Sequence, residues 1–157
     1  MRFRVFAAAL PAFIVLLLAP PAQAAMPTAP TAAMEAPVNR WIDAYNAHRA
    51  LPEDIFTDDV AVTDEFPPYV WTGIAGATQW DRAIDRGFPP QAHVETGAPR
   101  AFRTDRAGDR ASFVLPATLT YVVQGKNVTE HALWLFVVVR SGDDWKIAAD
   151  TWTGADP

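Results

Sequence analysis

The sequence contains no cysteine. Disulfides, thiol nucleophiles and zinc–thiolate sites are therefore excluded, and packing alone must stabilise the fold. The three histidines, His48, His93 and His131, do not cluster with one another or with carboxylates at a spacing typical of a metal site. The sequence also lacks a Gly-rich phosphate loop and a Gly-x-Ser-x-Gly nucleophile elbow. We therefore expect neither a metal nor another cofactor.

Basic residues are scarce. The chain has 13 lysines and arginines against 18 aspartates and glutamates, and its formal net charge is −5. A net acidic surface argues against nucleic acid and against an anionic membrane as partners.

The N-terminus has the order of a secretory signal peptide. Arg2 and Arg4 precede an apolar stretch, Val5–Ala19, that only Pro11 interrupts, and small residues lead up to Ala24. The stretch is shorter than the roughly 20 residues that span a bilayer, so we expect no stable membrane anchor. We predict cleavage after Ala24, and the mature protein would then be periplasmic or secreted in a bacterium.

Behind this signal peptide (1–24) we expect a flexible leader over 25–36, rich in Pro, Ala and Thr, and one domain over 37–157. Apolar residues at helical spacing predict a first helix that begins at Pro37. A short helical turn is expected over Leu51–Phe56, and a third helix ends near Gly87.

The other segments alternate as strands do. Pro99 and Pro116 lie inside two of them, where we expect an edge or a bulge. Helices first and a long antiparallel meander after them indicate an α+β fold. The expected strands are Val60–Asp64, His93–Thr104, Ala111–Val123, Val128–Arg140 and Trp145–Thr153.

The strand segment Ala132–Val139 is apolar on both faces. A strand of this kind should be covered on both sides. One face can border the pocket and the helices, and a second copy of the chain is the favoured cover for the other. The leader or the chain's own loops are the alternative to this homodimer.

Several stretches resemble the nuclear transport factor 2-like superfamily, above all its SnoaL-like bacterial members and the ketosteroid isomerases. They are Asn39–Ala47, Ile55–Val62, Trp71–Gly73 and Asp144–Trp152. The resemblance implies a cone-shaped α+β barrel, in which a strongly curved antiparallel sheet surrounds N-terminal helices and an apolar cavity. The superfamily hosts isomerases, dehydratases, cyclases and non-catalytic binders, so the resemblance does not fix an activity.

Asp64 is the candidate catalytic residue. It shares a strand face with Val60 and Val62, so its carboxylate is expected in apolar surroundings that raise its pKa. It also falls where the ketosteroid isomerases keep their general base. The alternative is an exposed aspartate at the end of a strand, because Glu65 follows immediately.

The resemblance also implies that this sequence lacks the other catalytic residues of the ketosteroid isomerases. Trp41 stands where those enzymes have a tyrosine, and Trp134 or Phe136 where they have a protonated aspartate. Steroid isomerisation by the familiar mechanism is therefore not expected. A pair of His131 with Asp64 or Asp150 is a minor alternative, since His131 lies on the strand face opposite Trp134.

We interpret the chain as an exported protein whose pocket binds a small apolar or aromatic molecule. One alternative is a cofactor-independent isomerase, dehydratase or cyclase that uses Asp64 as general acid or base. A second is a non-catalytic accessory or protein-association module. The expected ligand-binding residues are Trp41, Tyr45, Tyr69, Trp71, Tyr121, Trp134, Phe136 and Thr151.

Overall fold

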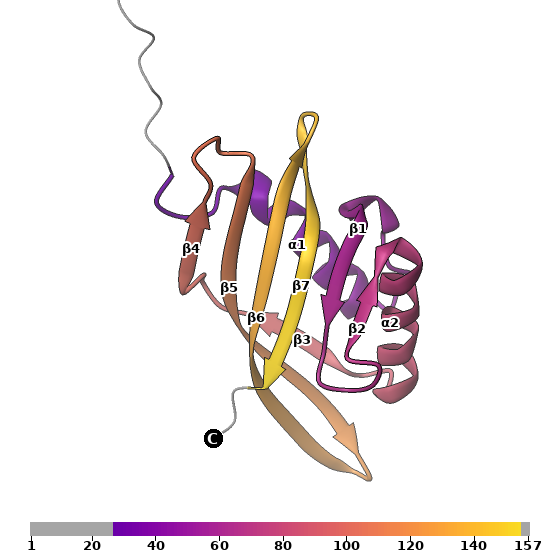
Figure 1. Cartoon of the computed structure of the whole chain (residues 1–157). Coiled ribbons are helices and arrows are strands. Elements are labelled where there is room, and N and C mark those ends of the chain that lie inside the picture. Colours follow the sequence, from indigo (N-terminus) through magenta and orange to yellow (C-terminus); the bar gives the residue numbers. More distant parts are fainter. Residues whose placement is uncertain (1–26, 155–157) are drawn as a thin grey trace, which may run out of the picture.

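Two helices pack on one side of a curved, seven-stranded sheet (Figure 1). The computed structural model describes residues 27–154, so the predicted signal peptide and its cleavage site lie outside the described residues. In chain order the elements are α1 (Ala32–Asn46), the 3-10 turn η1 (Glu53–Ile55), β1 (Phe56–Thr63), β2 (Val70–Thr72), α2 (Gly73–Gly87), β3 (His93–Thr96), β4 (Ala101–Thr104), β5 (Arg110–Val123), β6 (Lys126–Ser141) and β7 (Asp144–Gly154).

The strand order is β2-β1-β7-β6-β5-β3, and β4 also pairs with β5. The predicted α+β class and curved sheet are confirmed, but the sheet stays open between β2 and β3 rather than closing as a barrel. β1 and β7 run parallel, whereas every other pairing in the described sheet is antiparallel. The parallel pair brings the first strand of the chain beside the last, with only β2 between β1 and the edge of the sheet.

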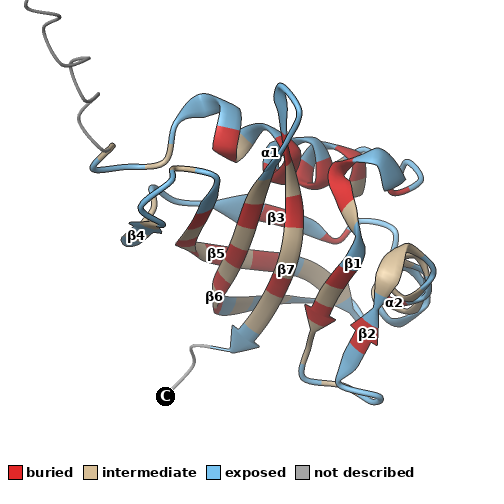
Figure 2. Cartoon of the chain, turned by 45° about the horizontal axis from the view of Figure 1, so that its top comes forward, coloured by how far each residue is buried: buried red, intermediate tan, exposed pale blue. Residues whose placement is uncertain are grey.

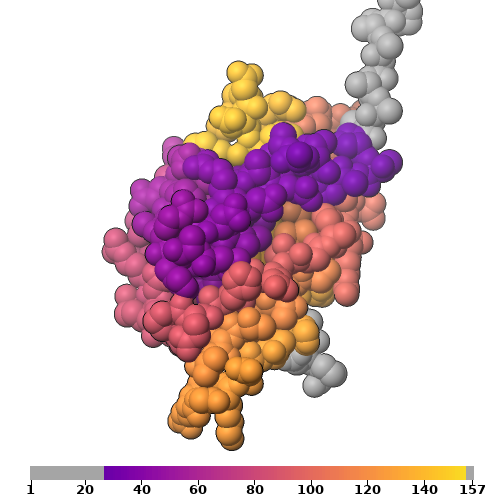
Figure 3. Space-filling view, turned by 180° about the vertical axis from the view of Figure 1, so that it is seen from behind, coloured from indigo at the N-terminus to yellow at the C-terminus, as the bar shows by residue number. Residues whose placement is uncertain are grey.

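Helix α1 begins five residues before the predicted start at Pro37, inside the segment expected to be a leader. Thr31 is its N-cap, and the Thr31 hydroxyl accepts a hydrogen bond from the backbone N–H of Met34 at 3.4 Å. The helix buries one stripe, which includes Val38 and Trp41, against the sheet. Seen from behind, α1 lies across this side of the molecule (Figure 3).

Helix α2 agrees with the prediction and ends at Gly87. Its buried residues, Ala77, Trp80 and Ile84, follow a spacing of three and four, which puts them on one face. Because this face contacts β1, the helix carries Trp80 over the inner side of the sheet.

The predicted strand His93–Thr104 is two strands, β3 and β4, because the chain leaves the sheet around Pro99. Both pair with β5, on either side of Pro116. The Pro116 carbonyl accepts a hydrogen bond from Gly97 N at 2.9 Å. A residue's N and O point the same way in a strand, so the missing N–H of Pro116 faces the interrupted edge.

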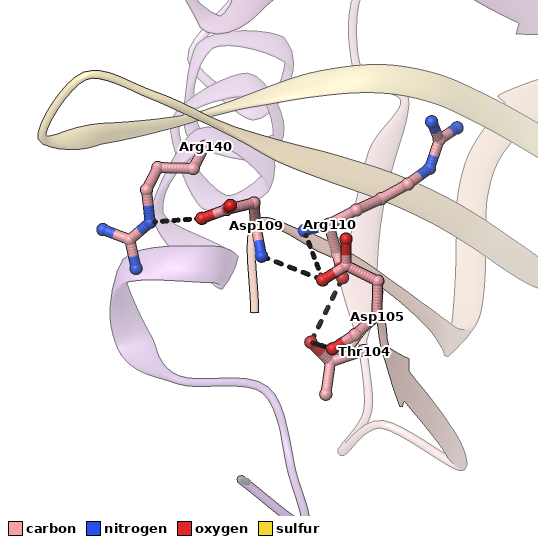
Figure 4. Close-up of polar contacts among 5 residues, drawn as sticks. All are labelled: Thr104, Asp105, Asp109, Arg110 and Arg140. Carbon is pink, nitrogen blue, oxygen red and sulfur yellow. Dashed lines mark hydrogen bonds and ion pairs between the residues drawn. The ribbon is translucent and has the colours of Figure 1, made fainter. Parts of the chain in front are cut away.

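The β5–β6 hairpin turns at Gln124 and Gly125, whose φ angles are 49° and 76°. Two successive positive φ values are the requirement of a tight two-residue hairpin. At the opposite end of β5, the Asp105 carboxylate accepts hydrogen bonds from the backbone N–H groups of Asp109 and Arg110, at 2.9 and 3.2 Å. The Arg140 guanidinium adds an ion pair to Asp109 (Figure 4). Side chains thus fix the β4–β5 turn.

Burial alternates along the long strands (Figure 2). On β6 the inner residues Ala132, Trp134, Phe136 and Val138 are buried, while the outer residues Leu133, Leu135, Val137 and Val139 are partly exposed. The two helices lie on the inner side, and no helix lies in front of β5, β6 and β7 in Figure 1. In the part of the chain that the structure describes, no helix has the length and hydropathy needed to cross a membrane.

Candidate functional site

A cavity of about 120 Å³ lies between the two helices and the inner face of the sheet. Four of the six tryptophans line it, and they come from four different elements: Trp41 from α1, Trp80 from α2, Trp134 from β6 and Trp152 from β7. Trp41, Trp80 and Trp134 are at most 4% exposed. The cavity is far smaller than the roughly 300–1,000 Å³ of drug-sized pockets, so it suits a small molecule.

The cavity tryptophans contact one another in fixed orientations. The Trp41 ring stacks on Trp80 with ring centroids 5.4 Å apart and on Tyr45 at 5.5 Å. Trp134 meets Trp41 edge-on at 4.5 Å and Trp152 edge-on at 5.2 Å. Rings packed on both sides have little rotational freedom, so the aromatic wall is preorganised. Phe66, Phe88, Ile84, Val94 and Leu119 complete its apolar part.

Asp64 supplies a carboxylate to the cavity wall. It directly follows β1, and its backbone N–H donates to the carbonyl of Tyr69 at 3.1 Å. Its two carboxylate oxygens accept different hydrogen bonds, one from Trp80 Nε1 at 2.8 Å and one from the Glu65 N–H at 2.6 Å. Burial raises the pKa of Asp64 more than these two hydrogen bonds lower it.

A second carboxyl group, Asp150, lies beneath the aromatic wall. It is 2% exposed, and its Oδ1 accepts a hydrogen bond from Trp134 Nε1 at 2.5 Å. Burial raises the pKa of Asp150 to about 8, and the negative charge of Asp64 acts in the same direction. Asp150 therefore holds its proton at neutral pH.

Glu65 and Glu130 are the other two carboxylates of the cavity wall. The Tyr121 hydroxyl donates a hydrogen bond to Glu130, which raises the pKa of Tyr121 to about 12. Glu65 accepts a hydrogen bond from the backbone N–H of Gly154. Glu65 is exposed and Glu130 is partly exposed, so these carboxylates lie nearer to solvent than the buried indoles.

The site carries no balancing positive charge. Of the described residues that line the cavity, none is lysine, arginine or histidine. The ion pairs found within residues 27–154 join Arg40 to Asp54, His93 to Glu95 and Arg140 to Asp109, all outside the cavity wall. Three carboxylates therefore face an apolar cavity without a cationic partner.

The edge strand β3 is attached to α1 through one side chain. Asn46 Nδ2 donates to the carbonyl of Val94 at 2.8 Å, and Asn46 Oδ1 accepts from the Val94 N–H at 2.8 Å. Both backbone groups of Val94 on this side are thereby satisfied. Since Val94 lines the cavity, this amide holds the wall formed by β3 against the helix.

The structure brings four of the residues predicted from sequence together in one cavity: Asp64, Trp41, Tyr45 and Trp134. Burial raises the pKa of Tyr45 to about 12, so its hydroxyl stays protonated. Tyr121 does not line the cavity, but it borders the wall through Glu130 and through an edge-on contact with Phe88 at 5.2 Å.

The other four predicted ligand-binding residues lie elsewhere. Phe136 is buried in the core against Trp134 and Phe113. Trp71 packs against Phe66 behind the wall, and Tyr69 is 54% exposed. Thr151 pairs with Leu135, which belongs to the outer face of the sheet.

A β-bulge explains why Thr151 lies outside and why sequence reasoning missed Asp150 and Trp152 as inner residues. The pairing of β7 shifts between Ala149, opposite Val137, and Ile147, opposite Val138. One additional residue reverses the alternation of side chains along the rest of the strand. Strict alternation from Trp145 and Ile147 would have placed Thr151 inside.

Trp80 and Glu130 were also missed, because each reaches the cavity only through the packing of elements distant in sequence. For Trp80 the helical stripe on α2 was a usable signal of burial, although not of its contact with Asp64.

The histidines lie apart from this site. His131 is exposed beside Thr118, on the strand face opposite Trp134, as the alternation predicts. Within residues 27–154, no three histidine or acidic side chains are grouped closely enough to hold a metal ion.

Comparison with known proteins identifies the fold. No family model matches the sequence, and no curated protein is similar to it in sequence. Among solved structures, a hexachlorocyclohexane dehydrochlorinase (LinA type 2) superposes with a TM-score of 0.69 and 13% identity, over 80% of this chain and 84% of that one.

Two further solved structures are similar. A ketosteroid isomerase-like protein from Erwinia carotovora atroseptica has a TM-score of 0.62 and 18% identity, over 80% and 96% of the two chains. A nuclear transport factor 2-like protein with a cystatin-like fold from Novosphingobium aromaticivorans has a TM-score of 0.63 and 13% identity, over 79% and 80%. The chain thus has the nuclear transport factor 2-like, cystatin-like fold.

Proposed function

We propose that the cavity binds a small, largely apolar molecule and that Asp64 exchanges a proton with it, as in a cofactor-independent lyase or isomerase. The observation that carries this proposal is the Asp64 carboxylate in the wall of an otherwise mainly aromatic cavity, held by Trp80 Nε1 and the Glu65 N–H. Two anchored oxygens fix the carboxylate toward the space that a ligand would occupy.

The state of Asp64 suits a base. Its pKa is raised by burial, which makes the ionised carboxylate a stronger proton acceptor than an exposed aspartate. In an elimination, the carboxylate would take a proton from carbon, the C–H electron pair would form the new double bond, and the leaving group would depart with its own pair. In an isomerisation, Asp64 would return the proton to another carbon.

The indole donors argue against enolate chemistry of the steroid isomerase type. Trp80 Nε1 already donates to Asp64, and Trp134 Nε1 donates to Asp150. Trp41 Nε1 is buried without a hydrogen-bond partner among the described residues, and a tryptophan is not an acidic donor. The solved structures with this fold include a dehydrochlorinase, and elimination needs no dedicated oxyanion site.

The test uses the mature chain and two kinds of measurement. Addition of 3,3-dimethylbutan-1-ol, a compact neutral alcohol, should shift the indole N–H resonances of Trp80 and Trp134 in a saturable way. Native mass spectrometry of protein purified from the producing cells should reveal the retained molecule and a mass that begins at residue 25.

Turnover of the molecule so identified should be lost in Asp64→Asn and kept in Asp59→Asn, an exposed aspartate on β1. If the alcohol left both indole resonances unchanged, the binding proposal would fail. If Asp64→Asn turned over the identified molecule normally, the catalytic half would fail.

A second copy of the chain is our proposal for the outer face of the sheet. Leu133, Leu135 and Val137 of β6 present partly exposed apolar side chains there, and β5 adds Val114 opposite Leu135. Apolar side chains on neighbouring strands form one continuous surface, which is typical of an interface. A two-fold axis would let this surface pack against the same surface of the second copy.

A further inference from the structure

The cavity combines two features that recognise different parts of one ligand. Its buried part is a cluster of tryptophans, and its more exposed part carries the carboxylates of Asp64, Glu65 and Glu130. A neutral apolar ligand would use only the first feature. It would also leave the carboxylates facing a desolvated, uncharged neighbour, which is unfavourable.

We infer that the ligand of this cavity is a small organic cation, an amine or quaternary ammonium compound, whose charge lies among these carboxylates and against the indole faces. This inference rests on the proposed function of the cavity as a ligand site, and it specifies the chemical class of the ligand.

The first argument is the uncompensated negative charge. Each of the three carboxylates has a hydrogen-bond donor, from Trp80, from Gly154 or from Tyr121, that holds it in place. None of them forms an ion pair within the described part of the chain. The carboxylates are therefore anchored by neutral groups, and their attraction for a cation is left available.

The second argument is the aromatic surface. Tryptophan is the aromatic side chain that attracts cations most strongly through its ring face. The cavity contains four tryptophans, and the edge-on contacts of Trp134 with Trp41 and Trp152 hold neighbouring rings nearly at right angles, with interplanar angles of 83° and 76°. Rings set at right angles form a concave corner, which suits a rounded ammonium group better than a flat ring.

The third argument excludes a bare metal ion as the cation. No group of three acidic or histidine side chains within residues 27–154 is close enough to hold a metal. The carboxylates line one cavity but do not converge on one point. A cation that fills the space between them must therefore be bulky, and a cavity of about 120 Å³ limits it to a few carbon atoms around the charge.

Choline and 3,3-dimethylbutan-1-ol separate charge from shape, because they differ only in a quaternary nitrogen in place of a quaternary carbon. Binding of each to the mature chain should be measured by calorimetry and by the indole N–H resonances of Trp80 and Trp134. We expect choline to bind about tenfold more tightly or better, as cation–π attraction and the carboxylates predict. Equal or weaker binding of choline would overturn the inference.

Two variants test whether the carboxylates of the cavity wall cause the preference for choline. Glu130→Gln keeps an acceptor for the Tyr121 hydroxyl but removes the charge, so it should weaken choline binding several-fold and leave the alcohol unaffected. Glu95→Gln, an exposed glutamate on β3 outside the cavity wall, is the matched control and should change neither. If Glu130→Gln and Glu95→Gln weakened choline binding equally, the effect would be one of overall charge, and the inference would fail.

The outcomes also separate this inference from the proposed function. If the alcohol binds and choline binds no more tightly, the inference of a cationic ligand is refuted, whereas the proposed apolar binding site still stands. Failure of both compounds to perturb Trp80 and Trp134 removes both proposals together.

Discussion

Trp80 Nε1 donates a hydrogen bond to Asp64 Oδ2 at 2.8 Å and thereby joins helix α2 to the end of β1. Trp80 is 1% exposed, so the indole is held rigidly by its packing against Trp41. This contact orients the carboxylate, and because a hydrogen bond favours the ionised form, it partly opposes the larger effect of burial, which raises the pKa of Asp64.

The substitution Trp80→Phe should raise the pKa of Asp64 further. It removes the donor that favours the ionised carboxylate and keeps an apolar ring in place. A carbon-13 NMR titration of the Asp64 carboxyl group measures the change directly, and Trp145→Phe, near Arg140 at the other end of the sheet, is the control. A lower or unchanged Asp64 pKa in Trp80→Phe would show that the indole does not stabilise the carboxylate.

Asp150 should make the protein less stable as the pH rises. Its pKa in the folded state is about 8, raised from 3.8, so between these values the folded state keeps a proton that the unfolded state has lost. The stability that this proton supports is complete below about pH 4 and is lost as the pH rises toward 8, by roughly 1.4 kcal/mol per pH unit at most.

Asp150→Asn should remove most of this dependence, because an amide still accepts from Trp134 Nε1 and does not ionise. Urea unfolding at pH 6.5 and pH 8 tests it, in a window above the pKa of Asp81, which burial raises to about 6. If the free energy of unfolding fell by the same amount between pH 6.5 and pH 8 in both proteins, the raised pKa assigned to Asp150 would be contradicted.

Asn46→Ala should loosen β3. The substitution removes two hydrogen bonds to Val94 and should lower the free energy of unfolding by about 2 kcal/mol. Hydrogen exchange at the Val94 amide should accelerate more than exchange in the centre of β6. Asn127→Ala, at an exposed position near the start of β6, is the control, and uniform acceleration across the sheet would indicate global destabilisation instead.

Leu135→Lys should separate the proposed dimer. A charge in the centre of an apolar interface is costly to bury, so analytical ultracentrifugation should give a monomer for the variant and a dimer for the parent chain. Val123→Lys alters an exposed apolar residue at the β5–β6 hairpin and should leave the dimer intact. A monomeric parent chain would refute the interface.

The elements that sequence predicted well are those with local signals. The helical spacing of apolar residues such as Trp80 and Ile84 indicated α2, and the expected strands Ala111–Val123 and Val128–Arg140 left a short turn for the β5–β6 hairpin. The parallel pairing of β1 with β7 has no local signal, because it joins strands from opposite ends of the domain. The family resemblance implied the curvature of the sheet, but it did not reveal that the sheet stays open.

The candidate site was predicted in part. Asp64 follows Val60 and Val62 on the inner face, and both valines are fully buried. A bulge in β7 places Asp150 on the inner face of the sheet and Thr151 on the outer face, the reverse of what strict alternation predicts. Alternation alone cannot detect such a bulge. The carboxylates of Glu65 and Glu130 come to one cavity only through the pairing of β7 and the packing of β6, so their common environment was not visible in sequence.

The central claim is that the Asp64 carboxylate faces the ligand, and the most direct test is its titration with and without a bound neutral molecule. Carbon-13 NMR of the mature chain should give an Asp64 pKa above the ordinary 3.8, and saturation with 3,3-dimethylbutan-1-ol should raise it further, since the alcohol's hydrocarbon part displaces water from the carboxylate. An ordinary pKa that the alcohol leaves unchanged would contradict the account.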